Sequence, residues 1–266
     1  MSVPAPVPHH DLTGPPDAPL LVLGPSLGTS TTVWEPLLPA LARTFRVARF
    51  DLPGHGGSPA APGTTSVADL AARVLALADR LGHRRFHYAG ISLGGAVGTH
   101  LAARHPHRVG SLALVCTSAR FGPAGPWRER AALVREQGTR PLLATSAGRW
   151  FADPAIAATA YGRALLRDLA TADPSSYAAC CDALAHCDLR RDLARITAPT
   201  LVVGGTLDIA TPLSHARELA AGIAGATLAT VPTGHLGAED HPAVEALLSA
   251  HLGRNRHPAS RSVPGC

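Results

Sequence analysis

Lysine is absent from this 266-residue sequence, so all 24 of its basic side chains are arginines. Together with 26 glycines, 24 prolines and frequent alanine, this composition is typical of a GC-rich genome. The net charge of +5 is therefore no evidence for an acidic partner. The arginines also form no dense run with interleaved aromatic residues, so the footprint of a nucleic-acid-binding protein is missing.

Long apolar runs are also lacking. No stretch approaches the ~18 consecutive apolar residues that a membrane-spanning helix needs. The N-terminus has no charged segment followed by an apolar one, as a signal peptide would have. We therefore expect a soluble cytoplasmic protein, with neither a membrane nor a nucleic acid as partner.

Cysteine is scarce, and its five positions form no recognised pattern: Cys116, Cys180, Cys181, Cys187 and Cys266. The odd count and the adjacent Cys180–Cys181 pair argue against a disulfide framework. A metal site is disfavoured because the sequence contains no C-x-x-C motif. We expect Cys180, Cys181 and Cys187 to be reduced and to pack on a helix as small hydrophobic side chains.

Short apolar runs alternate with periodic helical segments along much of the chain, and 46% of its residues are hydrophobic. Such alternation predicts an α/β domain built on a mostly parallel, doubly wound sheet with helices on both faces. Strands are predicted at Leu20–Ser26, Phe45–Asp51, His87–Ile91, Ser111–Thr117, Thr200–Gly204 and Thr227–Val231. Helices are predicted at Thr32–Arg43, Ser66–Leu81, Leu93–Arg104, Ser214–Ala221 and Pro242–Leu252.

The alternation stops in the middle of the chain, where residues 118–198 are helical and interrupted by prolines. We interpret this segment as a cap over the carboxyl edge of the sheet, where ligands of open α/β sheets bind. The core then comprises residues 20–117 and 199–252. Residues 1–19 are expected to form an irregular lead-in with room for a short edge strand, and residues 253–266 are expected to form a disordered tail.

A candidate nucleophile lies in Gly90-Ile-Ser92-Leu-Gly94, between a predicted strand and a predicted helix. Flanking glycines allow a sharp turn from which a serine side chain can project, as in a nucleophile elbow. The G-x-S-x-G string also occurs by chance, and the alternative is an ordinary turn with a solvated serine. The strand–turn–helix context favours the nucleophile.

A serine hydroxyl needs a base, and the base needs an orienting acid. Asp208 and His235 each follow their own predicted strand, so both are expected at the carboxyl edge, in the chain order of the α/β-hydrolase fold. Most of the 14 histidines are better interpreted as surface or core residues, including His55 in a glycine-rich loop. His235 is distinguished from the other histidines only by its position, in the loop after a predicted strand.

An oxyanion hole requires two N–H donors. The first candidate is the N–H of Leu93, the residue after the nucleophile. The second is the N–H of Leu27, in the loop after the first predicted strand. The alternative for this second loop is that it is merely a tight turn.

From about Leu20 to Leu252 the chain resembles the 3-oxoadipate enol-lactonases of aromatic catabolism, a family with the α/β-hydrolase fold. The most specific segments are Pro25-Ser-Leu-Gly-Thr29 with Trp34, Arg149-Trp-Phe151, Asp173-Pro-Ser-Ser-Tyr-Ala-Ala-Cys-Cys-Asp182 and Asp208-Ile-Ala-Thr-Pro212. Three features depart from the family pattern. Pro25 replaces a polar residue, Gly237 stands where serine or asparagine is common, and the N-terminal strand pair is eroded.

The resemblance implies hydrolysis of 3-oxoadipate enol-lactone to 3-oxoadipate, with no metal or organic cofactor. The acetate arm of this small lactone would need a cation, because burying an unpaired carboxylate is costly. Arg130 and Arg149 are the candidates, and Trp127 is a candidate wall for the flat ring. A solvated arginine or a core tryptophan is the alternative for each.

Relatives of this family are sometimes fused to a carboxymuconolactone decarboxylase, so the resemblance also suggests a functional association with such an enzyme. Two other functions stay open at this point. One is hydrolysis of another small ester or of a carbon–carbon bond by the same triad. The other is a non-catalytic ligand-binding protein that retains the fold.

Overall fold

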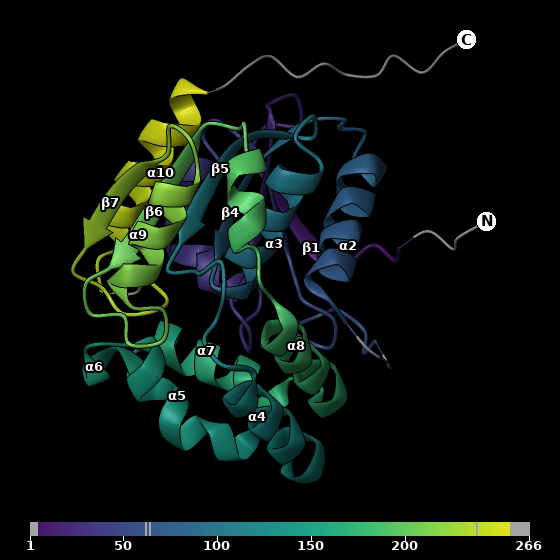
Figure 1. The fold of residues 1–266 in the computed structure, drawn as a ribbon, viewed down its shortest axis with the longest axis vertical. Coiled ribbons are helices and arrows are strands. Elements are labelled where there is room, and N and C mark those ends of the chain that lie inside the picture. Colours follow the sequence, from purple (N-terminus) through teal and green to yellow (C-terminus); the bar gives the residue numbers. More distant parts are fainter. Residues whose placement is uncertain (1–4, 62, 64, 238, 256–266) are drawn as a thin grey trace.

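A seven-stranded sheet runs through the protein, with its strands in the order β1-β3-β2-β4-β5-β6-β7 (Figure 1). The structure, a computed structural model, describes residues 5–61, 63, 65–237 and 239–255. All neighbouring strands are parallel except β1, which pairs antiparallel with β3. The strands are β1 (His10–Thr13), β2 (Leu20–Gly24), β3 (Arg46–Phe50), β4 (Phe86–Ile91), β5 (Val109–Val115), β6 (Thr200–Gly205) and β7 (Thr227–Val231).

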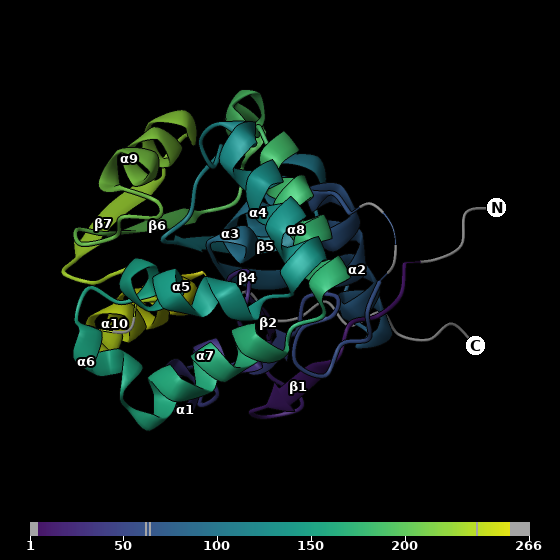
Figure 2. The same cartoon turned by 90° about the horizontal axis from the view of Figure 1, so that it is seen from below.

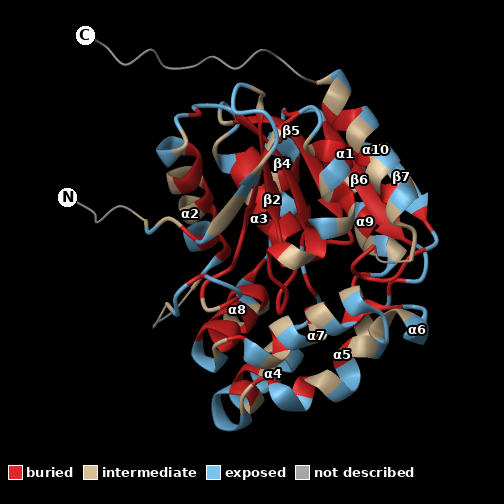
Figure 3. Ribbon diagram, turned by 180° about the vertical axis from the view of Figure 1, so that it is seen from behind, coloured by how far each residue is buried: buried red, intermediate tan, exposed pale blue. Residues whose placement is uncertain are grey.

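Helices cover both faces of this sheet (Figures 1 and 2). On one face lie α2 (Val67–Arg80), α3 (Leu93–Arg104) and α9 (Leu213–Gly222), and on the other lie α1 (Leu38–Leu41) and α10 (His241–Arg254). The central strands β2, β4, β5 and β6 are buried along their whole length, as expected for a parallel sheet covered on both faces (Figure 3). The predicted mostly parallel, doubly wound α/β fold is confirmed.

Helix α2 begins where its sequence signal predicts. The Ser66 hydroxyl accepts a hydrogen bond from the backbone N–H of Asp69, and the Asp69 carboxylate accepts one from the N–H of Ser66. This reciprocal capping box satisfies donors that the first helical turn leaves free. One face of the helix, with Leu70, Val74 and Leu77, is then buried in the core.

Five helices, here named the cap helices, lie beyond the carboxyl edge of the sheet (Figure 1). Prolines mark where several of them begin: Pro123 is the N-cap of α4, and Pro154 and Pro174 are the first residues of α6 and α8. Proline is tolerated there because the first-turn N–H groups have no partner within the helix. The cap helices are α4 (Ala124–Gln137), α5 (Leu143–Trp150), α6 (Pro154–Ala157), α7 (Ala160–Thr171) and α8 (Pro174–His186).

The predicted α-helix Thr32–Arg43 is wrong for most of its length. Residues Thr31–Leu37 form a 3-10 helix, η1, and only Leu38–Leu41 form the α-helical turn α1. Pro36 and Pro39 are the physical reason, because proline has no N–H to donate to the carbonyl four residues earlier. The Ser30 side chain caps the segment by accepting the N–H of Thr32.

At its N-terminal end the described chain has the short edge strand that the sequence allowed, and at its C-terminal end the last helix extends past its expected boundary. The lead-in contains strand β1, whose His10 is opposite Phe50 of β3. Helix α10 continues to Arg254, two residues further than predicted. Residues 256–266, most of the expected tail, lie outside the described residues.

The cysteines of the described chain are all buried and unpaired. Cys180 and Cys181 lie on α8, Cys187 is its C-cap, and Cys116 follows β5. Burial raises the pKa of all four thiols above the ordinary value. Cys266 lies outside the described residues. Among the helices that the structure describes, none is long and apolar enough to cross a membrane.

Candidate active site

Ser92 occupies a strained turn between β4 and α3. Its φ of 54° and ψ of −118° are rare for a residue with a side chain. The Ser92 N–H donates to the Val115 carbonyl oxygen at 3.1 Å, and the Thr117 hydroxyl donates to the Ser92 carbonyl oxygen at 2.6 Å. These bonds hold the serine in its unfavourable conformation, as strain at functional sites requires.

The glycines of the motif are needed because other backbone atoms approach them. A Cβ atom at Gly90 would lie 2.3 Å from the carbonyl carbon and oxygen of Gly94. One at Gly94 would lie 2.3 Å from the carbonyl oxygen of Gly24, at the end of β2. The motif therefore reflects the close packing of α3 against two strands.

Gly90→Ala is expected to destabilise the protein by about 1–3 kcal/mol, because the methyl group overlaps backbone that cannot move aside easily. Gly148→Ala is the matched control. Gly148 lies within α5, and a Cβ atom there meets nothing within 4 Å. This change should stabilise by about 0.4–1 kcal/mol. Denaturant unfolding measures both, and equal stability of the two variants would contradict the packing described.

Asp208 and His235 form a buried hydrogen-bonded pair. The Nδ1 atom of His235 lies 3.0 Å from Oδ2 of Asp208, and each residue is 5% exposed. Asp208 also accepts the Thr211 hydroxyl at 2.6 Å and the N–H groups of Ala210 and Thr211 at 2.8 and 3.0 Å. Burial raises the pKa of Asp208, but His235 and the Thr211 bonds outweigh it, so the pKa is lowered overall. The carboxylate therefore stays ionised at neutral pH.

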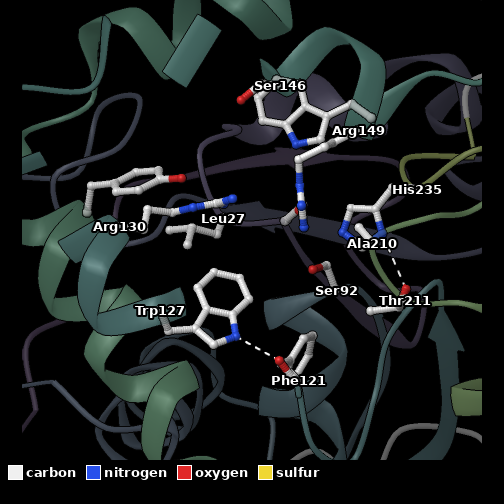
Figure 4. Close-up of a pocket in the computed structure, with 13 residues that line it drawn as sticks. Leu27, Ser92, Phe121, Trp127, Arg130, Ser146, Arg149, Ala210, Thr211 and His235 are labelled. Carbon is white, nitrogen blue, oxygen red and sulfur yellow. Dashed lines mark hydrogen bonds between the residues drawn. The ribbon is translucent and has the colours of Figure 1, made fainter. Parts of the chain in front are cut away.

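Ser92 and His235 line one cavity between the carboxyl edge of the sheet and the cap helices (Figure 4). Within the described ranges, no hydrogen bond joins the Ser92 hydroxyl to His235. Nucleophile–base contacts are often long without substrate, so this arrangement does not exclude the pair. The cavity is lined by Ser26, Leu27, Ser92, Phe121, Trp127, Arg130, Ser146, Arg149, Trp150, Tyr177, Ala210, Thr211 and His235.

The two candidate oxyanion donors are the N–H groups of Leu93, which directly follows Ser92, and of Leu27, which lines the same cavity as Ser92. Leu93 is the first residue of α3, so its N–H has no acceptor within the helix. Leu27 is in a turn closed by the Thr29 N–H to the Ser26 carbonyl oxygen, with Gly28 at φ 85°. Among the described residues, neither the Leu27 nor the Leu93 N–H donates a backbone hydrogen bond.

Trp127, Arg130 and Arg149 all reach the cavity from the cap helices (Figure 4). The Arg130 guanidinium lies over the Trp127 ring, 5.1 Å from its centroid. The Trp127 indole N–H donates to the Phe121 carbonyl oxygen at 2.7 Å, which fixes the ring. Burial lowers the pKa of Arg149, and the charge of Arg130 lowers it further. Within the described chain, neither arginine forms an ion pair with a carboxylate.

Several cavity residues were not among the sequence candidates: Ser26, Phe121, Ser146, Trp150, Tyr177, Ala210 and Thr211. Trp150, Tyr177 and Thr211 lie within the segments on which the family resemblance rests, so a signal for them existed. Nothing in the sequence distinguishes Ser146 or Phe121. His55, interpreted as structural, does not line the cavity but stacks on Tyr177 with ring centroids 5.9 Å apart.

No group of three or more His, Cys, Asp or Glu side chains in the described parts of the chain is placed to hold a metal ion.

The candidate site combines a serine, a histidine–aspartate pair, two N–H groups without a backbone acceptor and two arginines. These are the components of acyl transfer.

Comparisons with known proteins show the family to which the chain belongs. A family model described as alpha/beta hydrolase fold matches residues 19–242. The 3-oxoadipate enol-lactonase 2 of Acinetobacter baylyi is 35% identical over 241 residues, which cover 88% of this chain and 90% of that protein. The solved structure of the enol-lactonase from Burkholderia xenovorans matches with a TM-score of 0.89 and 34% identity, covering 92% of this chain and 96% of that chain.

A hydrolase from Pseudomonas aeruginosa has a crystal structure that matches with a TM-score of 0.87 and 41% identity, covering 92% of this chain and 93% of that chain. The resemblance predicted from the sequence is thus confirmed at the level of the family. The chain belongs to the α/β-hydrolase fold family and, within it, to the family of the 3-oxoadipate enol-lactonases.

Proposed function

We propose that the protein hydrolyses 3-oxoadipate enol-lactone to 3-oxoadipate in aromatic compound catabolism, with Ser92 as nucleophile, His235 as general base and Asp208 as its orienting acid. One observation carries the proposal. The strained Ser92 and His235, which is hydrogen-bonded to Asp208, share a cavity with two arginines that have no carboxylate partner in the described chain. Similarity to enol-lactonases supports an ester-bond hydrolase.

Acylation begins when the Ser92 hydroxyl attacks the lactone carbonyl carbon and His235 takes the hydroxyl proton. The carbonyl oxygen becomes an oxyanion that accepts hydrogen bonds from the Leu27 and Leu93 N–H groups. The intermediate collapses, the ring C–O bond breaks, and His235 returns the proton to the enol oxygen. The enol then becomes a ketone, and the acyl chain stays esterified to Ser92.

Deacylation repeats these steps with water. His235 takes a proton from a water molecule, whose oxygen attacks the ester carbonyl carbon. The bond to Ser92 breaks, and the proton passes from His235 to the serine oxygen. One lactone and one water thus give one 3-oxoadipate, and Asp208 stabilises the imidazolium in both halves.

The acetate arm of the lactone is a carboxylate at neutral pH, and we assign Arg130 and Arg149 to bind it. Burial is the main cause of the lowered pKa of Arg149, and repulsion by the neighbouring Arg130 guanidinium lowers it further. A bound carboxylate would relieve this repulsion and replace the water lost on burial. Trp127, held beneath Arg130, would wall the pocket against the ring.

Arg149→Ala and Arg130→Ala are each expected to raise KM for the enol-lactone, lowering kcat/KM by about 10- to 100-fold. This range corresponds to the ~1.5–3 kcal/mol of a hydrogen bond to a charged group. Hydrolysis of a neutral aryl acetate should change little, because that ester has no carboxylate to bind. Steady-state kinetics with both substrates measures the difference.

Arg128→Ala is the matched control, since Arg128 lies on the same helix as Arg130 but is exposed and does not line the cavity. It should leave both KM values unchanged. An arginine whose replacement leaves KM for the lactone unchanged has no part in binding the acetate arm.

The substrate assignment is tested by comparing kcat/KM for the enol-lactone with that for neutral aryl esters. A strong preference for the lactone is expected. A preference for the aryl esters would instead indicate a general small-ester hydrolase. Serine labelling by a fluorophosphonate without turnover of any ester would indicate a ligand-binding protein. A cytoplasmic location and association with a carboxymuconolactone decarboxylase stay predictions.

A further inference from the structure

Glu239 follows His235 by four residues, and its carboxylate bonds to the loop that carries this histidine. The Glu239 Oε2 atom accepts the Thr233 hydroxyl at 2.6 Å and the Gly234 N–H at 2.7 Å. Gly234 directly precedes His235 in the chain. One oxygen of the carboxylate therefore fixes the backbone from which the imidazole projects.

The other oxygen of Glu239 bonds to the cap. Its Oε1 atom accepts the Ala152 N–H at 2.5 Å and the Asp153 N–H at 3.4 Å. These residues follow the C-cap, Phe151, of helix α5, which ends at Trp150 and carries Arg149. The second oxygen thus bonds to the segment that follows α5, the helix that supplies Ser146, Arg149 and Trp150 to the cavity lining.

The two segments also contact one another without the glutamate. The Leu236 N–H donates to the Trp150 carbonyl oxygen at 3.4 Å. A Cβ atom on Gly234 would lie 2.8 Å from both the Trp150 carbonyl oxygen and the Ala152 nitrogen. The backbones therefore lie against each other, and a small movement of either segment would move the other.

The four groups that bond to Glu239 are all donors: three backbone N–H groups and the Thr233 hydroxyl. The side chain at this position must therefore accept hydrogen bonds on two oxygens. A carboxylate accepts on both oxygens, whereas an amide replaces one acceptor with an NH₂ donor. Burial raises the pKa of Glu239, but the bonds from Thr233, Gly234 and Ala152 outweigh it and lower the pKa overall. No arginine or histidine in the described chain forms an ion pair with this carboxylate.

We propose that Glu239 is a positioning residue that couples the placement of His235 to that of Arg149. This inference rests on the proposed function, since it takes His235 as the base and Arg149 as a ligand of the substrate carboxylate. We call the two sets of bonds to Glu239 the bridge, with one side on the His235 loop and the other on the cap. Loss of the bonds on the loop side affects His235, and loss of the bonds on the cap side affects Arg149. Misplacing His235 lowers kcat for every ester, whereas misplacing Arg149 raises KM only for a substrate with a carboxylate.

The test is Glu239→Gln, assayed with a neutral aryl acetate and with the enol-lactone. We expect kcat for the aryl acetate to fall by about 10-fold or more, within the ~100-fold that a 1 Å misplacement can cause. The enol-lactone should lose kcat to the same degree and show a raised KM as well. All rates are expressed per serine that a fluorophosphonate labels, so unfolded protein does not contribute.

Two further variants separate the positioning effect from the effect of losing a negative charge, and the loop side of the bridge from its cap side. Glu245→Gln makes the same charge change in the neighbouring helix α10 and should leave kcat and KM unchanged. Thr233→Val removes the hydroxyl bond to Oε2 but keeps the Gly234 bond. It should lower kcat less than Glu239→Gln does and leave KM for the lactone unchanged, because the cap side of the bridge is intact.

The proposal would be overturned if Glu239→Gln and wild type had the same KM and the same kcat per labelled serine, whatever the change in thermal stability. A fall in kcat with no change in KM would remove the coupling to Arg149. Failure of the proposed function gives a different pattern, in which wild type hydrolyses the aryl acetate but not the lactone. In that case the effect on aryl acetate kcat alone still decides whether Glu239 positions His235.

Discussion

Ser92→Ala is expected to lower kcat for the enol-lactone by about 10⁴- to 10⁶-fold, the range seen when a catalytic serine is removed. Nucleophilic attack is impossible without the hydroxyl, and only the oxyanion donors and binding groups remain. Because the substitution removes a single atom from a residue already held by backbone bonds, the fold should not change. Steady-state kinetics measures the loss, and thermal unfolding confirms that the variant is folded.

Ser146→Ala is the control, since it deletes a second serine hydroxyl that lines the same cavity. Its kcat should stay within a few-fold of wild type. A Ser92→Ala variant that retained more than about a hundredth of wild-type kcat would exclude Ser92 as nucleophile, given the range above.

Asp208→Asn is expected to lower kcat by about 10⁴-fold while leaving the packing intact. The carboxylate accepts the Nδ1–H of His235, so that Nε2 is free to take the serine proton. An amide that turns its NH₂ towards Nδ1 favours the opposite tautomer, with the proton on the wrong nitrogen. The Ala210 and Thr211 N–H groups both donate to Oδ1 of Asp208, so the amide oxygen should take that place and the NH₂ group should face Nδ1 and the Thr211 hydroxyl, which can accept.

Asp51→Asn provides the matched control for a buried carboxylate. Asp51 is 1% exposed and accepts the N–H groups of Thr31 and Gly57, but it does not line the cavity. Its replacement should lower stability and leave kcat per labelled serine nearly unchanged. Equal losses of kcat in the two variants would assign the effect to burial and not to orientation of His235.

Local sequence signals predicted the parts of the site that local geometry determines. The glycines around Ser92 are visible in the sequence because each lies where a Cβ atom would overlap backbone. Asp208 and His235 follow strands β6 and β7, whose ends meet at one edge of the sheet. The mostly parallel, doubly wound sheet could be predicted from the alternation of short apolar runs with helices, whereas the order of its strands could not.

Other features depend on contacts that no local pattern encodes. Glu239 bonds to Ala152, 87 residues away in the chain. Tyr177 reaches the cavity because α8 packs beside the loop of His55, whose ring stacks on it. The 3-10 helix Thr31–Leu37 was missed for a different reason, since its apolar residues suit an α-helix and only the prolines oppose it.

The central claim is hydrolysis of the lactone, and the most direct measurement is ultraviolet-monitored loss of freshly generated 3-oxoadipate enol-lactone with the wild-type protein. We expect rapid loss above the spontaneous rate, with 3-oxoadipate as the product and no added metal or cofactor. A folded wild-type protein that leaves the lactone at its background rate would contradict the assignment.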